Sequence, residues 1–357
     1  MISVTVAAVS QCCPEKFRTN YPEEALLRAF KFRVRKDVVK IVEHMIQHPD
    51  YQAHIASDTL ALQNALLQAA LAGHLEVVRL LLCWTPNAPQ ADCLDGAVLL
   101  AACKVGQVEM LRTLLTWPGS SPQRPPGTWC WQGLMAASGN GHVGVVKMLL
   151  TWPDLHLPAN CLNCEALVAA SRNGHVGVVQ TLLSWPVHAP RADCRKNECL
   201  ISAARYGHAD VVAALLGSSQ HAPRADCRNN LALDIAIRYR RDSVVKMLLG
   251  WPENAARADY YDGEGLMVAA NYGHTEVMRT LLSWPRHAPR ADVNDGEALV
   301  VAAQKGRVDM VRMLLEWPVH APKADCSEGE ALMIALENCH VEVVRILMSH
   351  QEGIVFT

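Results

Sequence analysis

The amino-acid sequence predicts an all-α solenoid, in which stacked helix pairs are joined by short hairpin-like loops. Three observations lead to this prediction. An alanine recurs with a leucine three residues before it, a pair of leucines recurs in step with them, and in most units a glycine stands between the two patterns. The interval is 33 residues, apart from one of 35. Such a unit has an apolar face that it cannot bury alone, so stacked copies are needed for stability.

The first part of the chain precedes the regular repeat. Residues 1–20 show no period, and we expect a loose N-terminal arm there. Residues 21–50 hold two amphipathic stretches that carry more charge than the later units. This pattern predicts a degenerate helix pair that caps the solenoid with one face in water. Residues 51–59 are then a linker.

Nine repeat units are expected to fill residues 60–350, followed by a C-terminal tail at 351–357. The leucine and alanine of the first helix share one face because they are three residues apart. In the second helix, Val178-Val179 and Leu182-Leu183 form a stripe that neighbouring layers would bury on both sides. The recurring alanines are Ala69, Ala102, Ala137, Ala170, Ala203, Ala236, Ala269, Ala302 and Ala335.

The recurring glycine predicts where the first helix of each unit ends. Gly174 stands where a left-handed residue is needed to stop a helix, and the same position is glycine in most other units. The tryptophans that follow the paired leucines are also periodic, so we expect them to be structural. The equivalents of Gly174 are Gly73, Gly106, Gly141, Gly207, Gly273 and Gly306.

The segment Ala203–Leu216, with its Ala-Ala-x-x-Gly-His core followed by Val-Val and Leu-Leu, resembles the ankyrin repeat. The resemblance extends from about Leu62 to Met348, and a period of 33 residues is that of the family. The Thr-Pro-Leu-His opening of the family is absent, and Glu-Ala-Leu stands there instead. The resemblance implies a non-catalytic scaffold that binds another protein on its concave face.

Composition argues against several classes of function. The chain holds 33 lysines and arginines against 35 aspartates and glutamates, which gives no general affinity for nucleic acid or an anionic membrane. No uninterrupted apolar run is long enough to span a bilayer. Cys161, Cys194 and Cys227 recur every 33 residues, and stacked layers about 8–10 Å apart are too distant for disulfides. We therefore expect thirteen free thiols and an intracellular, cytoplasmic protein, with an organelle left open.

Several patterns invite a chemical interpretation that their context does not support. The histidines after the turn glycine lie a full layer apart, too far to share a metal ion, so we expect each to hydrogen-bond turn backbone. Cys161 and Cys164 have the spacing of a zinc knuckle but lack a second pair. Residues 139–144 match G-x-G-x-x-G, yet they lie between two helices instead of after a strand. We expect no enzyme activity, cofactor, metal or small-molecule substrate.

The candidate site consists of residues that break the repeat while remaining exposed. Arginine recurs two residues before the turn glycine position, and tyrosine stands beside it in three units. Arginine and tyrosine are enriched at binding hot spots, although solvated polar residues at a helix end are the alternative. We therefore predict a partner-binding row of Arg172, Arg205, Tyr206, Arg238, Tyr239, Asn271 and Tyr272, with Arg195 and Lys196 at the hairpin tips.

A second irregularity is the insertion at residues 119–133, which is rich in proline. Trp129 and Trp131 lie there, off the periodic tryptophan positions. The prolines suggest a polyproline II segment, and the two tryptophans are candidate partner contacts. The alternative is a loop that packs on its own tryptophans.

The predicted row suits a protein partner that carries an acidic or phosphorylated segment. Two other functions stay open. The chain could be an adaptor that recruits a client to a larger complex such as a ubiquitin ligase. It could also be an RNA-associated subunit that uses the central arginine and tyrosine patch, since those residues also bind phosphates and stack on bases.

Overall fold

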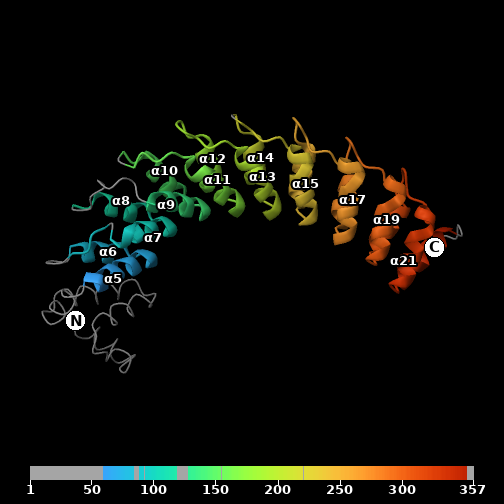
Figure 1. Cartoon of the computed structure of the whole chain (residues 1–357), viewed down its shortest axis with the longest axis horizontal. Coiled ribbons are helices and arrows are strands. Elements are labelled where there is room, and N and C mark those ends of the chain that lie inside the picture. Colours follow the sequence, from blue (N-terminus) through green and yellow to red (C-terminus); the bar gives the residue numbers. More distant parts are fainter. Residues whose placement is uncertain are drawn as a thin grey trace, which may run out of the picture. The chain divides into compact units, whose positions relative to one another are not determined.

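The computed structural model describes residues 59–83, 88–91, 93–118, 128–153, 155–219 and 221–351. The predicted arm at 1–20 and capping pair at 21–50 lie outside these residues, as does the tail after Gln351. The described residues form eighteen α-helices and one short 3₁₀-helix, with no strand among them (Figure 1). The predicted all-α fold class is therefore confirmed.

The helices follow one another as consecutive pairs, each made of a first and a second helix. The pairs are α5 (Thr59–Ala72) and α6 (Leu75–Leu82), α7 (Ala97–Val105) and α8 (Val108–Thr116), α9 (Thr128–Gly139) and α10 (Val143–Thr151), α11 (Cys161–Asn173) and α12 (Val176–Leu183), α13 (Cys194–Tyr206) and α14 (Ala209–Leu216), α15 (Cys227–Arg238) and α16 (Asp242–Gly250), α17 (Tyr260–Tyr272) and α18 (Thr275–Leu282), α19 (Val293–Gln304) and α20 (Val308–Leu315), and α21 (Cys326–Glu337) and α22 (Val341–Gln351). The 3₁₀-helix η1 (Leu94–Gly96) precedes α7.

The chain divides into two compact units. Unit 1 comprises residues 1–170 and 184–189, and unit 2 comprises residues 171–183 and 190–357. Within unit 1, α7 contacts both α5 and α9, while α8 contacts α6 and α10. Within unit 2, the first helices α13, α15, α17, α19 and α21 contact one another in order (Figure 1). Like helices therefore stack on like in each unit.

The periodic apolar residues form the core of the stack. In the repeat that contains α13 and α14, Leu200 and Ala203 from the first helix and Val211 and Leu215 from the second have no exposed surface. Burying a side chain such as Leu215 stabilises the fold by about 1.5–3 kcal/mol. Helices of eight to thirteen residues are marginal alone, so this burial between repeats supplies their stability.

The turn between the two helices of a repeat is closed by a left-handed residue, as predicted. Gly207 has φ +83°, and its N–H donates to the carbonyl of Ala203 at 3.0 Å. Six equivalent glycines have φ between +64° and +80°. Two repeats accept a non-glycine residue here, Arg240 (φ +53°) and Cys339 (φ +58°). Left-handed backbone costs an L-residue roughly 1–2 kcal/mol, so these two turns carry strain that the glycine turns avoid.

The loops that lead into the first helices are not β-hairpins. The first residues of α13 form a single left-handed turn, with φ of +51°, +56° and +66° at Arg195, Lys196 and Asn197. The same turn recurs at residues 228–230, 261–263, 294–296 and 327–329. The N–H of Asp193 donates to the carbonyl of His221 at 3.1 Å, and this hydrogen bond joins one loop to the next. The hairpin-like loops thus form a continuous edge without any strand.

Four of the loops also hold an ion pair that neutralises their arginine. Arg191 donates two hydrogen bonds to Asp193, at 2.9 and 2.8 Å, and this contact lowers the pKa of the Asp193 carboxyl. The pair repeats at Arg224 and Asp226, Arg257 and Asp259, and Arg290 and Asp292. These loop arginines therefore add no uncompensated charge to the surface.

The last repeat presents an apolar face of the kind that earlier repeats bury. Met333 and Leu336 of α21 are 60% and 56% exposed. Their equivalents one repeat earlier, Val300 and Ala303, are 8% and 0% exposed, and they belong to α19, which α21 contacts. One sequence position is therefore core in one repeat and surface in the next.

Eleven cysteines lie in the described part of the chain, and all are free thiols. Cys83 and Cys339 are exposed, whereas Cys103 is fully buried. Burial raises the pKa of the Cys103 thiol from 9.0 to about 12. Because only the thiolate is nucleophilic, Cys103 is protected both by packing and by its protonation.

Thiol labelling of the native protein at pH 8 is expected to separate these cysteines. Cys83 and Cys339 should react within minutes because they are exposed. Cys103 should react at least about 1,000-fold more slowly, since it is buried and its raised pKa leaves little thiolate. Labelling with a maleimide followed by peptide mass spectrometry measures each site. Adding urea is the control, because unfolding should equalise the rates. Equal rates in the native protein would mean that α7 is not packed as described.

Candidate partner-binding surface

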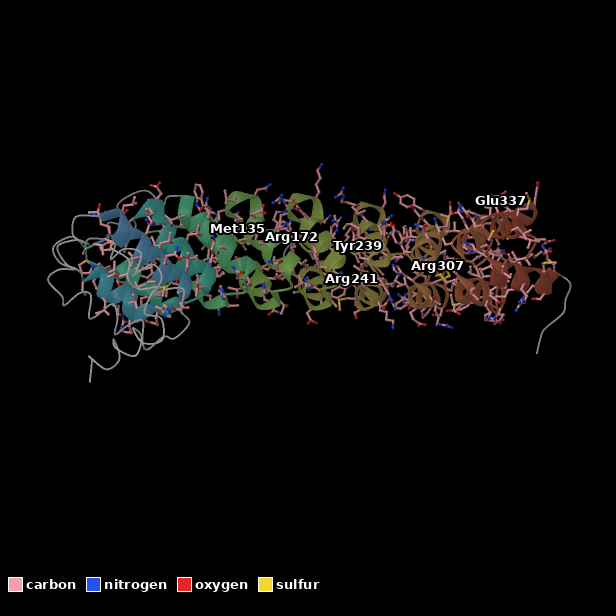
Figure 2. All side chains as sticks on the ribbon, turned by 90° about the horizontal axis from the view of Figure 1, so that it is seen from below. Met135, Arg172, Tyr239, Arg241, Arg307 and Glu337 are labelled. Atoms are coloured by element: carbon pink, nitrogen blue, oxygen red, sulfur yellow. The ribbon has the colours of Figure 1, made fainter. Side chains whose placement is uncertain are left out.

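The predicted arginine and tyrosine row lies at the ends of the first helices of four consecutive repeats. We call Arg172, Arg205, Tyr206, Arg238, Tyr239, Asn271 and Tyr272 the Arg/Tyr surface; all belong to unit 2. The helices α11, α13, α15 and α17 end at or just after these residues because a left-handed residue follows each of them. Tyr206, Tyr239 and Tyr272 are 47%, 44% and 43% exposed. Figure 2 shows Arg172, Tyr239, Arg241 and Arg307 on the same face.

The arginines and tyrosines of this surface contact each other across repeats. The guanidinium of Arg205 lies 5.3 Å from the centre of the Tyr239 ring, one repeat further on. In the same way Arg238 lies 5.7 Å from the centre of the Tyr272 ring and donates to its hydroxyl at 3.3 Å. Each such cation–π contact contributes about 0.5–1 kcal/mol at an exposed site. The rings are thus held in place although much of their surface faces water.

Two of the tyrosine rings stack on the histidine rings of their own turns. Tyr206 stacks on His208 with ring centres 6.4 Å apart, and Tyr272 on His274 at 5.9 Å. The Nε2 of His208 lies 3.0 Å from the carbonyl oxygen of Arg172, and four repeats show the equivalent contact. The predicted hydrogen bonding of these histidines to backbone is confirmed. The carbonyl belongs to the preceding repeat, so each imidazole also joins two repeats.

Some arginines at this surface form ion pairs with carboxylates of the same protein. Glu198 pairs with Arg195 at 2.8 Å and with Arg172 at 3.9 Å, which brings the loop tip and the helix end together. Arg238 pairs with Oδ2 of Asp234 at 3.2 Å, and the Tyr260 hydroxyl donates to Oδ1 of the same carboxylate at 3.2 Å. In the described part of the chain, Lys196 and Arg205 have no carboxylate within 4.0 Å. The positive charge therefore centres on fewer residues than the sequence suggested.

Two arginines that the predicted site left out occupy the place of the turn histidine. Arg241 donates from Nε to the carbonyl of Arg205 at 2.9 Å, as His208 contacts Arg172. Arg307 lies against Gly273, where an added Cβ would come within 2.9 Å of Cζ. Both are visible in the sequence as departures from Gly-His, at Arg240-Arg241 and Gly306-Arg307. This replacement of histidine by arginine is the sequence signal that identifies them.

Trp129 and Trp131 lie in α9, within unit 1, and both are half-buried. The indole of Trp129 covers Gly96, where an added Cβ would lie 2.7 Å from the ring. This contact joins α9 to the start of α7. Residues 119–127 of the insertion lie outside the described part. Docking of a partner on this segment stays a prediction, and the packing of Trp129 favours the structural alternative.

Within the described ranges, no group of three or more histidine, cysteine, aspartate or glutamate side chains is placed to hold a metal ion. The search of the same residues for a helix long and apolar enough to cross a membrane found none. What the surface offers chemically is a set of ordered aromatic rings, hydroxyls and guanidinium groups.

Stacked helix pairs that recur every 33 residues, apart from one interval of 35, with an exposed row that crosses them, define a helical repeat protein. A family model for ankyrin repeats, in three copies, matches residues 99–189 and 266–356, about half of the chain. The chain therefore belongs to the ankyrin repeat family, as its sequence indicated. Ankyrin repeats are generally protein–protein interaction modules, and the family is typically non-catalytic. No curated protein matches the chain.

Proposed function

We propose that this protein is a non-catalytic binding scaffold that holds another protein on its Arg/Tyr surface. The observation that carries the proposal is the state of the three tyrosines. Tyr206, Tyr239 and Tyr272 are each more than 40% exposed, yet each is held by a ring or guanidinium contact. Exposed aromatic rings that are already ordered are what a binding surface requires.

The energetic reason is pre-organisation. Immobilising a flexible side chain on binding costs about 0.5–1.5 kcal/mol. Here Arg205 already orders Tyr239, and Arg238 already orders Tyr272, so less of this cost falls on the complex. Tyrosine and arginine also supply large contact areas at interface hot spots.

The charge of the surface favours a partner segment that is acidic or phosphorylated. Lys196 and Arg205 stand without a carboxylate within 4.0 Å among the described residues. Guanidinium groups form strong paired hydrogen bonds to carboxylate and phosphate oxygens. A partner that supplies such oxygens would complete contacts that the protein itself leaves open.

Replacing Tyr206 and Tyr239 together by alanine is expected to weaken capture of the protein partner at least about 10-fold, since two hot-spot side chains are lost. The midpoint of thermal unfolding should change little, because both side chains are largely exposed. Affinity capture with quantitative mass spectrometry identifies the partner, and titration with the purified partner then measures the dissociation constant.

The matched control is Tyr261→Ala, which removes an exposed tyrosine (58%) that is not part of the Arg/Tyr surface. This variant should capture the partner as the wild type does. Unchanged capture by the double variant would overturn the proposal, and a large loss of thermal stability would mean that the rings are core. Capture that nuclease treatment abolishes would identify RNA as the ligand instead. Co-capture of ligase subunits would identify the adaptor function.

A further inference from the structure

The turn position after the left-handed residue differs in kind between repeats. It is histidine in six repeats and glutamine at Gln107, but arginine at Arg241 and Arg307; the histidines are His74, His142, His175, His208, His274 and His340. Histidine can satisfy the backbone contact there, as His208 and His274 do. Arginine is therefore not required by the fold at these two positions, and its permanent charge needs another explanation.

The side chains of Arg241 and Arg307 leave their charge available. Arg241 uses Nε for the Arg205 carbonyl at 2.9 Å, so this contact does not engage its two terminal nitrogens. Arg307 is exposed, as is Arg240 beside Arg241. None of the three has a carboxylate within 4.0 Å in the part of the chain that the structure describes.

Two of the three turns in this part of unit 2 are basic, and the turn between them, residues 271–274, carries no lysine, arginine or carboxylate. Residues 238–241, 271–274 and 304–307 contain five arginines and lysines and no aspartate or glutamate. Arg238 forms an ion pair with Asp234. Among the described residues, no such ion pair is found for Arg240, Arg241, Lys305 or Arg307. Two basic turns, on either side of the Asn271–His274 turn, thus form a basic strip that continues the Arg/Tyr surface along unit 2.

We infer that this strip binds an extended polypeptide segment whose acidic side chains lie along the repeats, with one carboxylate at Arg241 and another at Arg307. This inference rests on the proposed function and specifies its partner. The two arginines are two repeats apart, or roughly 20 Å at 8–10 Å per layer. An extended chain rises about 3.3 Å per residue, so the two acidic positions are about six residues apart.

The ring contacts favour a peptide over RNA. Single-stranded nucleic acid binds through bases stacked on open aromatic faces. The Tyr272 ring is already contacted by Arg238 and by His274, and the Tyr239 ring by Arg205. Hydroxyl groups and ring edges remain for contact, which suit a peptide better than a base.

The test replaces both arginines by the residue that other repeats use, in the double variant Arg241→His and Arg307→His. Because histidine occupies this position beside Gly174 and elsewhere, the fold is expected to be retained. The probe is a fluorescent peptide with pairs of glutamates six residues apart in an alanine and serine background. At pH 7.5 the double variant should bind this peptide roughly 30-fold more weakly than the wild type, as measured by fluorescence anisotropy.

Measuring peptide binding at pH 5.5 separates a charge effect from a purely structural one, because a structural role of these arginines would not make binding depend on pH. Imidazole with an ordinary pKa near 6.5 is then mostly charged, while the peptide glutamates stay largely ionised. Binding by the double variant should recover at least about 5-fold relative to the wild type. The matched control is Arg279→His with Arg312→His, which makes the same change on α18 and α20; Arg279 pairs with Glu276, and Arg312 lies one helical turn after Asp309. This control should bind the peptide as the wild type does.

Equal binding by the Arg241 and Arg307 variant, or an equal loss in the control variant, would overturn the inference. So would tight binding of a single-stranded oligouridylate that displaces the peptide. These outcomes are distinct from failure of the proposed function. If the acidic peptide does not bind but the Tyr206 and Tyr239 variant still loses its protein partner, only the inference of an acidic segment falls. If the peptide binds as expected but the Tyr206 and Tyr239 variant still captures its protein partner, the proposed role of the Arg/Tyr surface is wrong instead.

Discussion

Replacing Ala303 by glutamate is expected to destabilise the protein by about 4 kcal/mol or more. Ala303 has no exposed surface and lies in α19, which packs against α21. A carboxylate placed there would be buried without a partner, which costs several kcal/mol. Urea unfolding followed by circular dichroism measures the change in the free energy of unfolding.

The chain contains its own control for this substitution. Leu336 occupies the same repeat position one unit later and is 56% exposed. Leu336→Glu should therefore change stability by no more than about 0.5 kcal/mol, as ordinary surface substitutions do. If the two variants were equally unstable, the last repeat would be covered by something that the described residues do not include, and its exposed face would need a new explanation.

Replacing Gly174 by valine is expected to cost about 3–4 kcal/mol. Gly174 has φ +80°, a conformation that costs an L-residue roughly 1–2 kcal/mol and a β-branched one more. An added Cβ would also lie 2.5 Å from Nδ1 of His208. The imidazole would have to move and lose its contact with the Arg172 carbonyl, worth about 1 kcal/mol. Denaturant unfolding of both proteins measures the difference.

A second left-handed glycine separates backbone strain from this steric clash. Gly329 has φ +78°, but an added Cβ there meets nothing within 4 Å. Asparagine stands at the equivalent positions Asn197 and Asn230, and it tolerates left-handed backbone. Gly329→Asn should therefore cost less than about 1 kcal/mol. A loss as small for Gly174→Val would show that the His208 contact does not hold the repeats together.

Both predictions concern the same property, the rigidity with which one repeat is held on the next. The His208 contact that Gly174 permits ends at the carbonyl of Arg172, a residue of the Arg/Tyr surface. The spacing of Arg241 from Arg307 likewise depends on the repeats between them. A stack that keeps this spacing in the free protein presents a partner with charges already at their binding distances.

Much of the fold could be predicted from the sequence because its causes are local. A leucine and an alanine three residues apart must share a helix face, and a glycine in left-handed backbone must end a helix. These rules placed the helix pairs and the turns at Gly174 and Gly207. The family followed from the same pattern. The exposed tyrosines of the candidate site also lie where the broken repeat indicated.

The tertiary structure alone decided how these residues meet, because the deciding contacts join residues a full repeat apart. Arg238 reaches Tyr272, 34 residues later, and His208 reaches back 36 residues to Arg172. Nothing in the local sequence shows that Glu198 pairs with Arg172, or that Trp129 covers Gly96. The left-handed turn at Arg195 also escaped prediction, since stacking between neighbouring loops stabilises a backbone that local preference disfavours. Periodicity thus defines the scaffold, and contacts between repeats define its surface.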